Sequence, residues 1–263
     1  MSKLYIIGAG LAPDLITLRA LNILRNVKKV FIEQYTGLLV LDENLKNILK
    51  DKDVQVLSRA DLEDFEGRKI FDSLRKGDVA ILVPGDPLVA TTHASIIVEA
   101  YKRGYKVEII PGISIIPNAL TMTGLMIYKI GKPVTLVYPK EGITYDYPYD
   151  IIKDNDARNL HTVLLLELDM EKGIVMKVNE AVDILFRIEN MRKEGVIRPN
   201  RMAVAVAALG SKKQVICFST LEDLKRLTIN EIPQTLIITS PKLHFMEEEM
   251  LKVISNEYCK PRK

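Results

Sequence analysis

The sequence lacks long apolar runs and any strong excess of charge of one sign. Its net charge is only +3 over 263 residues, which gives no indication of a nucleic-acid partner. No apolar run reaches the roughly 18 residues that a membrane helix requires. The first residues, Met-Ser-Lys, lead directly into an apolar strand pattern, so no signal peptide is expected. These absences predict a cytoplasmic protein that binds neither membranes nor nucleic acid.

Cysteine and histidine are also scarce. Cys217 and Cys259 are the only cysteines, and their separation suggests neither a metal site nor a disulfide framework, as expected in a reducing compartment. Cys217 lies in an apolar strand pattern and is expected to be a small core residue. His93, His161 and His244 occur singly, without metal-ligand spacing. Each is expected to be a packed or surface side chain, and no metal is expected.

Several catalytic motifs are missing. No G-x-x-x-x-G-K-[ST] sequence occurs, which excludes a P-loop NTPase, and no G-x-S-x-G sequence occurs, which excludes the nucleophile elbow of a hydrolase. Gly8-Ala9-Gly10 begins like a dinucleotide-binding fingerprint, but Pro13 stands where the third glycine should be. A nicotinamide-dependent enzyme is thereby disfavoured. A tight strand-to-helix turn explains these glycines at least as well.

What the chain does contain is the composition of a globular protein, with 48% hydrophobic and 27% charged residues. Glutamine is scarce while Ile, Lys and Glu are plentiful, which leans towards a thermophilic source. Strand and helix patterns alternate in the N-terminal half, with strands expected at residues 4–7, 29–33, 54–57, 79–83 and 107–110. This alternation predicts βαβ units and a mostly parallel sheet with helices on both faces.

The C-terminal half is expected to hold a mixed sheet. The strands expected at residues 201–207 and 214–219 are joined by a connector too short for a parallel crossover, so this pair is expected to be antiparallel. A break at residues 128–133, rich in Gly and Pro, is the expected boundary. We therefore predict two domains: an N-terminal α/β domain over 1–130 and a C-terminal α/β domain over 134–263.

The stretch Val83–His93, VPGDPLVATTH, is the strongest candidate for a ligand site. Its two prolines forbid both helix and strand pairing around Gly85-Asp86, so the chain must turn sharply after a buried strand. In an open α/β sheet, ligands bind at the carboxyl ends of central strands. The loops that carry Gly8, Gly85 and Gly112 all follow strands and can gather at that edge.

Asp86 is the charged residue of this turn, and two roles remain open for it. It either anchors the turn by accepting hydrogen bonds from backbone N–H groups or faces a ligand. After the turn, a helix is expected over residues 91–103, with Gly104 at its C-terminal end.

Two further stretches have a plain structural interpretation. The acidic run Glu247-Glu248-Glu249 is most simply the solvated face of the last helix. The tyrosines at 145, 147 and 149 could form an aromatic rim for a substrate, but anchoring of their loop is the safer prediction.

The stretches GDPLVATTH, SIIPNALTMTGLMIYKIGKP, NLHTVLLLEL and EIPQTLIIT resemble the archaeal diphthine synthases, members of the tetrapyrrole methylase superfamily. The resemblance runs through essentially the whole chain, including YIIGAGL near its start and EQYT at residues 33–36. It implies two α/β domains with S-adenosyl-L-methionine in the cleft between them, usually in a homodimer. It also implies repeated N-methylation of the 3-amino-3-carboxypropyl-histidine of translation elongation factor 2, a step of diphthamide biosynthesis, with S-adenosyl-L-homocysteine as product.

The resemblance assigns cofactor contacts to nine residues that follow or end predicted strands: Leu11, Asp86, Val89, Ser114, Ile115, Leu166, Ala208, Leu209 and Gln234. Relatives often carry histidine where Gln234 stands, and glutamine can hydrogen-bond but cannot carry charge. No catalytic residue is assigned, because methyl transfer to an amine is an in-line displacement that depends mainly on alignment in a partly dry cleft.

Two other functions stay open on the residues alone. A corrin or precorrin C-methyltransferase would use the same fold, because a fold does not fix its substrate. A nucleotide-binding module without catalysis would bind the adenosyl ligand and transfer nothing.

Overall fold

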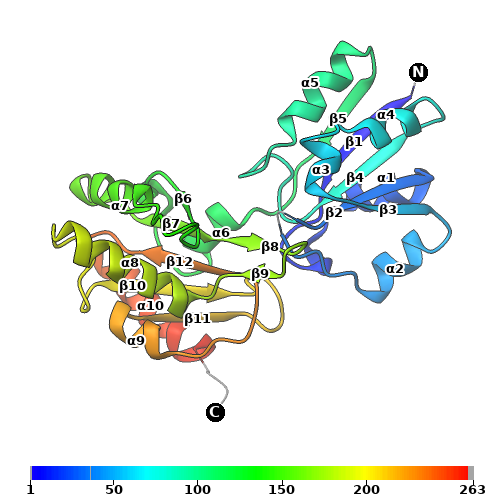
Figure 1. The fold of residues 1–263 in the computed structure, drawn as a ribbon. Coiled ribbons are helices and arrows are strands. Elements are labelled where there is room, and N and C mark those ends of the chain that lie inside the picture. The colour runs from blue at the N-terminus through cyan, green and yellow to red at the C-terminus, as the bar shows by residue number, and fades with distance from the viewer. Residues whose placement is uncertain (1, 36, 260–263) are drawn as a thin grey trace. The chain divides into compact units, whose positions relative to one another are not determined.

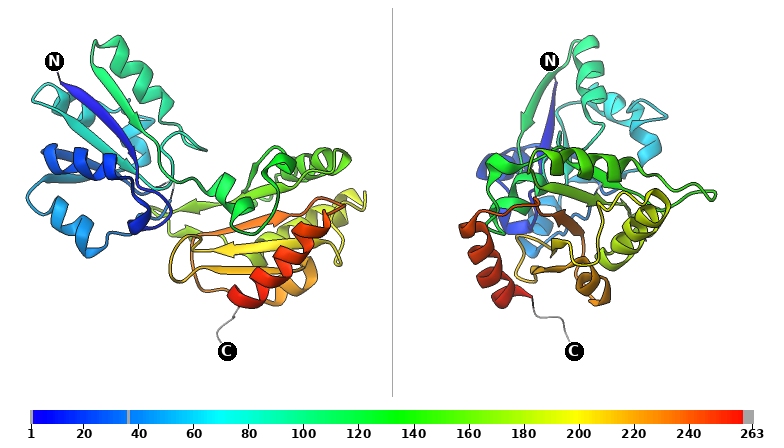
Figure 2. Two further views of the ribbon diagram at one scale, coloured as in Figure 1. Left: turned by 180° about the vertical axis from the view of Figure 1, so that it is seen from behind. Right: turned by 90° about the vertical axis from the view of Figure 1, so that its left-hand side faces the viewer.

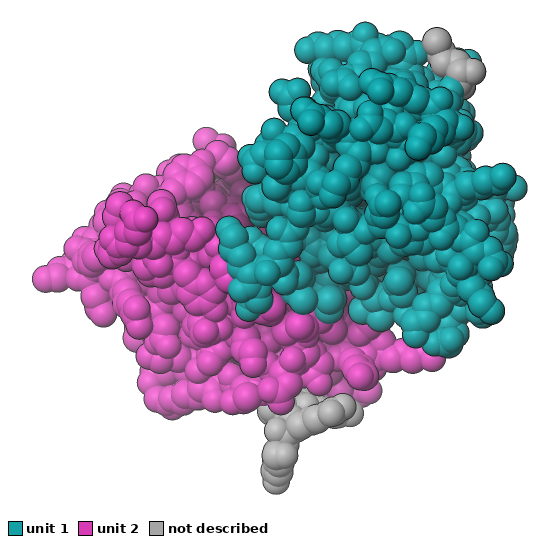
Figure 3. Space-filling view, turned by 45° about the vertical axis from the view of Figure 1, so that its right-hand side comes forward, with its two compact units in different colours: residues 1–114, 169–173 teal, residues 115–168, 174–263 magenta. Residues whose placement is uncertain are grey.

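The chain divides into two compact units, which Figure 3 colours separately. Each unit is built on one five-stranded sheet (Figure 1). The computed structural model describes residues 2–35 and 37–259. Residues 1–114 and 169–173 contact mainly one another and form the first unit, and residues 115–168 and 174–263 form the second. The predicted pair of α/β domains, one with a parallel sheet and one with a mixed sheet, is confirmed.

The sheet of the first unit is entirely parallel, in the order β3-β2-β4-β1-β5. Its strands are β1 (Lys3–Gly8), β2 (Lys29–Glu33), β3 (Asp53–Leu57), β4 (Val79–Val83) and β5 (Lys106–Ile110). All five residues of β4 are buried, which agrees with the continuous apolar run expected of a strand covered on both faces.

Helices cover both faces of this sheet (Figure 1). The elements are η1 (Pro13–Leu15), α1 (Leu18–Asn26), α2 (Glu43–Leu49), α3 (Arg59–Leu62), α4 (Arg68–Leu74) and α5 (Ala94–Lys102). Leu82 packs in the core formed with α1 and α2, whereas its neighbour Ile81 packs in the core formed with α4 and α5. The two faces follow from right-handed crossovers that run in opposite directions across the sheet.

The second sheet is mixed, in the order β11-β10-β12-β7-β6. Its strands are β6 (Val134–Leu136), β7 (Thr162–Leu166), β10 (Met202–Ala207), β11 (Val215–Thr220) and β12 (Gln234–Ile238), and a small pair is made by β8 (Leu168–Asp169) and β9 (Ile174–Val175). β10 and β11 are antiparallel, as their short connector predicts, whereas β6 and β7 are parallel.

Two groups of helices enclose this sheet. One face is covered by α7 (Tyr147–Ala157), α8 (Val178–Arg192) and α9 (Leu221–Arg226), and the other by α6 (Ile115–Thr121) and α10 (Phe245–Tyr258), with η2 (Ile127–Lys129) following α6. Figure 2 shows α10 lying against its face of the sheet. Over the described part of the chain, no helix combines the length and the apolar character needed to span a bilayer.

The two units meet in sequence at Ser114–Ile115, earlier than the break expected at residues 128–133. The reason is apolar packing: Leu120 and Leu125 belong to the core that also holds Leu251 of α10. Residues 115–130 are therefore part of the second unit, and the Gly- and Pro-rich break lies inside it.

A buried polar cluster fixes this segment to the second unit. Glu247 is fully buried and accepts hydrogen bonds from Lys129 Nζ at 2.7 Å, from the backbone N–H of Met126 at 2.9 Å and from that of His244 at 2.8 Å. The ring of His161, also fully buried, binds Glu247 Oε1 through Nε2 at 2.9 Å. The expectation that Glu247 is solvated was wrong, because its carboxylate pairs with Lys129 and accepts hydrogen bonds from the backbone N–H groups of Met126 and His244 inside the fold.

The tautomer of His161 follows from its partners. Its Nδ1 accepts from the backbone N–H of Ser240 at 2.9 Å, so Nε2 carries the hydrogen that is donated to Glu247. Burial lowers the pKa of His161, although the neighbouring carboxylate opposes the shift. Burial alone would raise the pKa of Glu247, but the hydrogen bonds from Lys129, His244, Met126 and His161 outweigh it and lower that pKa to about 2.

We expect the substitution Glu247→Gln to lower the free energy of unfolding at neutral pH by about 2–4 kcal/mol, because it leaves Lys129 without its buried counter-charge. A carboxyl whose pKa is depressed on folding stabilises the fold above its unfolded pKa of about 4.3 and loses this contribution as the pH falls towards 2. Denaturant unfolding between pH 7 and pH 3 should therefore show the difference between wild type and variant shrinking with acidity. A difference that stays constant over this range would contradict the assignment.

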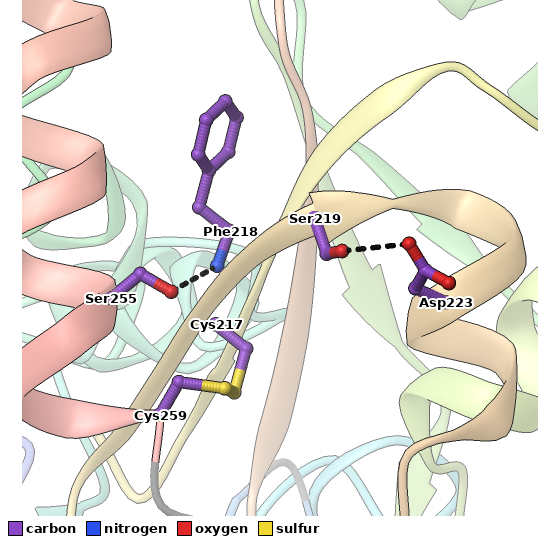
Figure 4. The surroundings of a disulfide bond; sticks show 6 residues. All are labelled: Cys217, Phe218, Ser219, Asp223, Ser255 and Cys259. Carbon is purple, nitrogen blue, oxygen red and sulfur yellow. Dashed lines mark hydrogen bonds between the residues drawn. A yellow bond between two sulfur atoms is a disulfide. The ribbon is translucent and has the colours of Figure 1, made fainter.

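The two cysteines form a disulfide bond, contrary to the expectation of unlinked thiols (Figure 4). Cys217 lies in β11 and Cys259 directly follows the last residue of α10, with their Cα atoms 4.7 Å apart. Ser255 Oγ of α10 also accepts a hydrogen bond from the backbone N–H of Phe218 at 3.0 Å. The two cysteines are 42 positions apart in the sequence. The packing of α10 on β11 brings them together, and spacing alone could not reveal the bond.

The substitution Cys259→Ser should lower the free energy of unfolding by about 2–4 kcal/mol, since the cross-link restricts the unfolded chain. Cys259 is the better position to change because Cys217 lies in the core. Denaturant unfolding with and without reductant measures the effect, and reduced wild type serves as the matched control. Equal stability of variant and oxidised wild type would argue against the bond.

Candidate cofactor-binding site

Three glycine-bearing loops meet at the carboxyl edge of the first sheet, as the sequence predicts. β1 lies between β4 and β5. Gly8 is the last residue of β1, and the loops after β4 and β5 carry Gly85 and Gly112. A Cβ atom added to Gly8 would lie 2.5 Å from the nitrogen of Gly112 and 2.6 Å from the carbonyl oxygen of Gly85. The three backbones are therefore in direct contact, at distances that only glycine permits.

Hydrogen bonds hold two of these loops together. Gly10 and Gly85 exchange a pair of backbone hydrogen bonds, at 3.1 Å and 3.0 Å. The helix after β1 covers one face of the sheet and the helix after β4 covers the other. The crevice between neighbouring strands whose connections leave on opposite faces is where open α/β sheets bind ligands.

Asp86 anchors this edge. Its Oδ1 accepts from the backbone N–H of Leu88 at 3.0 Å, and its Oδ2 accepts from that of Gly112 at 3.1 Å. The carboxylate thus joins the β4 loop to the β5 loop, which is the structural role weighed for it from sequence. Each oxygen keeps a further lone pair, since an ionised carboxylate has about four acceptor sites, so the same group can also receive a ligand hydroxyl or ammonium.

The surroundings of Asp86 suit a ligand with a polar and an apolar part. Leu88 and Val89 expose 40% and 36% of their surface. A Cβ added to Gly85 would have a single neighbour within 4 Å, the carbonyl oxygen of Ile113 at 3.8 Å, so space remains beside its backbone. Leu11 is half-buried on the adjoining loop.

The helix after the turn begins at Ala94, three residues later than expected. The carbonyl oxygen of Pro87 accepts from Thr91 Oγ1 at 2.6 Å and from His93 Nδ1 at 2.8 Å, and Ala90 adopts a positive φ of 57°. These features favour a compact turn over an extra helical turn.

Four of the other assigned residues lie at one edge of the second sheet: Leu166, Ala208, Leu209 and Gln234. Leu166 ends β7, Gln234 begins the antiparallel β12, and Ala208 and Leu209 follow the end of β10. Ala207 is paired with Gln234, and Leu165 with Thr235. The ladder register therefore brings the four together.

The side chain of Gln234 is already engaged within the second unit. Its Oε1 accepts from the backbone N–H of Val178 at 2.8 Å, and its Nε2 donates to the carbonyls of Ile229 and Glu231, both at 2.9 Å. Leu166 and Leu209 are buried at 7% and 4% exposure. At these positions the backbone is the part of the residue that can reach a ligand.

Ser114 and Ile115 occupy the point where the chain passes from one unit to the other. Ser114 is buried at 8% exposure. Ile115 begins α6 and packs against the core that includes Leu209. Among the described residues, no three His, Cys, Asp or Glu side chains gather as metal ligands would.

Of the three tyrosines predicted to anchor a loop, Tyr147 and Tyr149 belong to α7 instead, and only Tyr149 is buried. Tyr149 is fully buried and its hydroxyl donates to Glu189 at 2.9 Å, while the Tyr147 hydroxyl accepts from Lys132 Nζ at 2.7 Å. Tyr145 is exposed at 43%.

A buried polar group beside the turn was missed by sequence reasoning. Glu33, at the end of β2, is fully buried, and its carboxylate lies 3.9 Å from Nε2 of the buried His93. Tyr35 is buried at 1% exposure, and burial raises its pKa to about 12. The sequence held one indication of this contact: the EQYT stretch, which contains Glu33, and the ATTH stretch, which contains His93, both belong to the resemblance. Thr36 of EQYT lies outside the described residues.

We expect the substitution Gly112→Ala to disrupt the edge, because its Cβ would collide with the carbonyl oxygen of Gly85. The backbone must shift to relieve this overlap. Overpacking of this kind typically lowers the free energy of unfolding by about 1–3 kcal/mol. Gly77→Ala is the matched control, since nothing lies within 4 Å of its Cβ position. Thermal unfolding should separate the two variants clearly, and equal melting temperatures would contradict the packing described here.

Comparison with known proteins agrees with this architecture. A family model described as Tetrapyrrole (Corrin/Porphyrin) Methylases matches residues 3–225. The diphthine synthase of Methanocaldococcus jannaschii is 38% identical over 256 residues, covering 95% of this chain and 98% of that protein. The diphthine synthase of Staphylothermus marinus is 41% identical over 257 residues, covering 95% and 93%.

A solved structure gives the same result. A crystal structure of a diphthine synthase superimposes with a TM-score of 0.85 at 31% sequence identity, covering 97% of this chain and 96% of that one. The chain therefore belongs to the tetrapyrrole methylase family and, within it, to the diphthine synthases, and it is a methyltransferase.

Proposed function

We propose that this methyltransferase repeatedly transfers methyl groups from S-adenosyl-L-methionine to the amino group of the 3-amino-3-carboxypropyl-histidine of translation elongation factor 2, a step of diphthamide biosynthesis. S-adenosyl-L-homocysteine is the product of the cofactor. The observation that carries the proposal is the GDPLVATTH turn, whose backbone and Asp86 complete the ligand-binding edge of the first sheet in a chain similar to diphthine synthases over 95% of its length.

We assign cofactor binding to the nine residues that the resemblance implies: Leu11, Asp86, Val89, Ser114, Ile115, Leu166, Ala208, Leu209 and Gln234. Asp86 offers its remaining lone pairs to a hydroxyl or ammonium group while it holds the two loops in place. The apolar walls come from residues such as Val89. Gln234 contributes its backbone, because its amide is engaged elsewhere.

When bound, the cofactor would supply a methyl group on its sulfonium sulfur: the amine nitrogen would bond to the methyl carbon in line as the C–S bond breaks, and the sulfur would leave as the neutral thioether of S-adenosyl-L-homocysteine. The residues of the chain then have to align donor and acceptor and exclude water from the reacting atoms. The amine has only to lose a proton to solvent or to a carboxylate, so we assign no catalytic acid–base pair. We assign Asp86 the role of a cofactor anchor and not of a general base, since the backbone N–H groups of Leu88 and Gly112 hold its carboxylate in place at the loops.

We also propose a cytoplasmic, homodimeric protein, in line with the proposed substrate and the resemblance. Met246, Met250 and Val253 form an exposed apolar stripe on α10, and stripes of this kind suit contact with another protein chain. The disulfide is unusual for a reducing compartment, but intracellular proteins of hyperthermophiles are rich in such bonds. The amino-acid composition, poor in Gln and rich in Ile, Lys and Glu, favours a thermophilic source and agrees with this explanation.

The decisive experiment is incubation with methyl-labelled S-adenosyl-L-methionine and elongation factor 2 that carries the unmethylated 3-amino-3-carboxypropyl-histidine. We expect label on the factor and none on factor that lacks the modified side chain. Transfer to a precorrin but not to the factor would identify a corrin C-methyltransferase instead. Cofactor binding without transfer to any acceptor would identify a non-catalytic module.

The same assay separates the two roles of Asp86. In Asp86→Asn the amide nitrogen cannot accept the second backbone N–H, so the loops lose one of their links. We expect KM for S-adenosyl-L-methionine to rise about 10-fold or more, as for a lost hydrogen bond to a charged group, with a much smaller change in kcat. Unchanged cofactor affinity together with lost turnover would contradict the anchor role.

A further inference from the structure

The turn between Asp86 and His93 is fixed at both ends by side chains. At its start, the Asp86 carboxylate binds the N–H groups of Leu88 and Gly112. At its end, Thr91 Oγ1 and His93 Nδ1 both bind the carbonyl oxygen of Pro87, at 2.6 Å and 2.8 Å. Pro87 directly follows Asp86, so the bonds at the end of the turn constrain the residue that positions the carboxylate.

The ring of His93 is placed unusually for a residue that only fills space. It is 2% exposed. Because a carbonyl oxygen can only accept, Nδ1 must carry the hydrogen of the 2.8 Å bond to Pro87. Among the described residues, Nε2 has no hydrogen-bond partner, and it lies 3.9 Å from the Glu33 carboxylate. Burying a ring nitrogen without a hydrogen-bond partner costs free energy, so the unpartnered Nε2 calls for an explanation beyond packing.

The two ends of the ring therefore have different neighbours. Nδ1 faces the turn that carries Asp86, whereas Nε2 faces the end of β2. The ring bridges a fixed strand of the sheet to an otherwise exposed turn, whose residues Leu88, Val89 and Ala90 are all exposed. Packing alone would be served equally by leucine, which has no donor for the Pro87 carbonyl.

We propose that His93 is a positioning residue for the cofactor: through its Nδ1–H it holds the Pro87 carbonyl, and thereby sets Asp86 and the exposed Leu88–Val89 wall in the conformation that binds S-adenosyl-L-methionine. This inference rests on the proposed function, because it concerns the same ligand. It assigns to the ATTH stretch a role in binding without any contact with the ligand.

Two substitutions of His93 distinguish the contribution of Nδ1 from that of Nε2. Asparagine places its amide nitrogen where Nδ1 stands, so His93→Asn keeps a donor for Pro87 and loses the group that faces Glu33. Glutamine places its amide nitrogen near Nε2, so His93→Gln does the reverse. Both variants shorten or reshape the same buried side chain, so their effects on overall stability should be similar.

The measurement is calorimetric binding of S-adenosyl-L-homocysteine, which is not consumed, together with thermal unfolding. We expect the Kd of His93→Asn to stay within about 3-fold of wild type and that of His93→Gln to rise about 10-fold or more, as for loss of one buried hydrogen bond. In turnover assays His93→Gln should raise KM for the methyl donor while kcat changes little. Equal Kd values for the two variants, or Kd values that only follow the melting temperatures, would overturn the proposal.

A second pair of variants covers the case in which changes at His93 prevent folding. Thr91→Val removes the other donor to Pro87 and keeps the side-chain shape. Thr121→Val is its matched control, because Thr121 Oγ1 donates in the same way to the carbonyl four residues earlier, that of Pro117, at 3.2 Å. We expect a weaker Kd for Thr91→Val and an unchanged Kd for Thr121→Val. An unchanged Kd for both would count against positioning through Pro87, whereas failure of the wild type to bind would remove the proposed function itself.

Discussion

The candidate site depends on one constraint, the direct contact of three backbones at the edge of the first sheet. Gly8, Gly85 and Gly112 approach so closely that a single added methyl group would overlap main-chain atoms. Everything else at this edge follows from that approach. The paired hydrogen bonds of Gly10 and Gly85 become possible, and the N–H of Gly112 comes within reach of the Asp86 carboxylate.

Within each unit, buried polar groups join stretches that are far apart in sequence. His93 of the turn meets Glu33 at the end of β2 in the first unit. In the second unit, Lys129 and His161 meet at Glu247 of the last helix. Buried charges are tolerated only when they are paired and hydrogen-bonded. These buried groups therefore fix the positions of loops and helices within each unit.

The sequence predicted the strands of the first sheet, the antiparallel β10–β11 pair, the parallel and mixed sheets and the meeting of the glycine loops, because these depend on local patterns and on topology rules. It did not predict the small β8–β9 pair. Prediction from sequence failed where contacts between residues distant in the sequence decide whether a side chain is buried or bonded. Glu247 looked solvated because Met126, Lys129 and His161, which bind its carboxylate, are all more than 80 residues away. The Cys217–Cys259 bond joins positions 42 apart in the sequence. The helix after the turn was expected too early because two side-chain bonds to Pro87 compete with helix formation there.

For the second unit, the disulfide changes which parts can open independently. A terminal helix is usually the first element of a domain to detach by local fluctuation. Here the end of α10 is covalently joined to β11, an edge strand of the sheet. The helix therefore cannot leave its apolar face without moving the strand, and helix and strand form one cooperative unit. A segment that would otherwise expose the core first is thereby tied to the stability of the whole sheet.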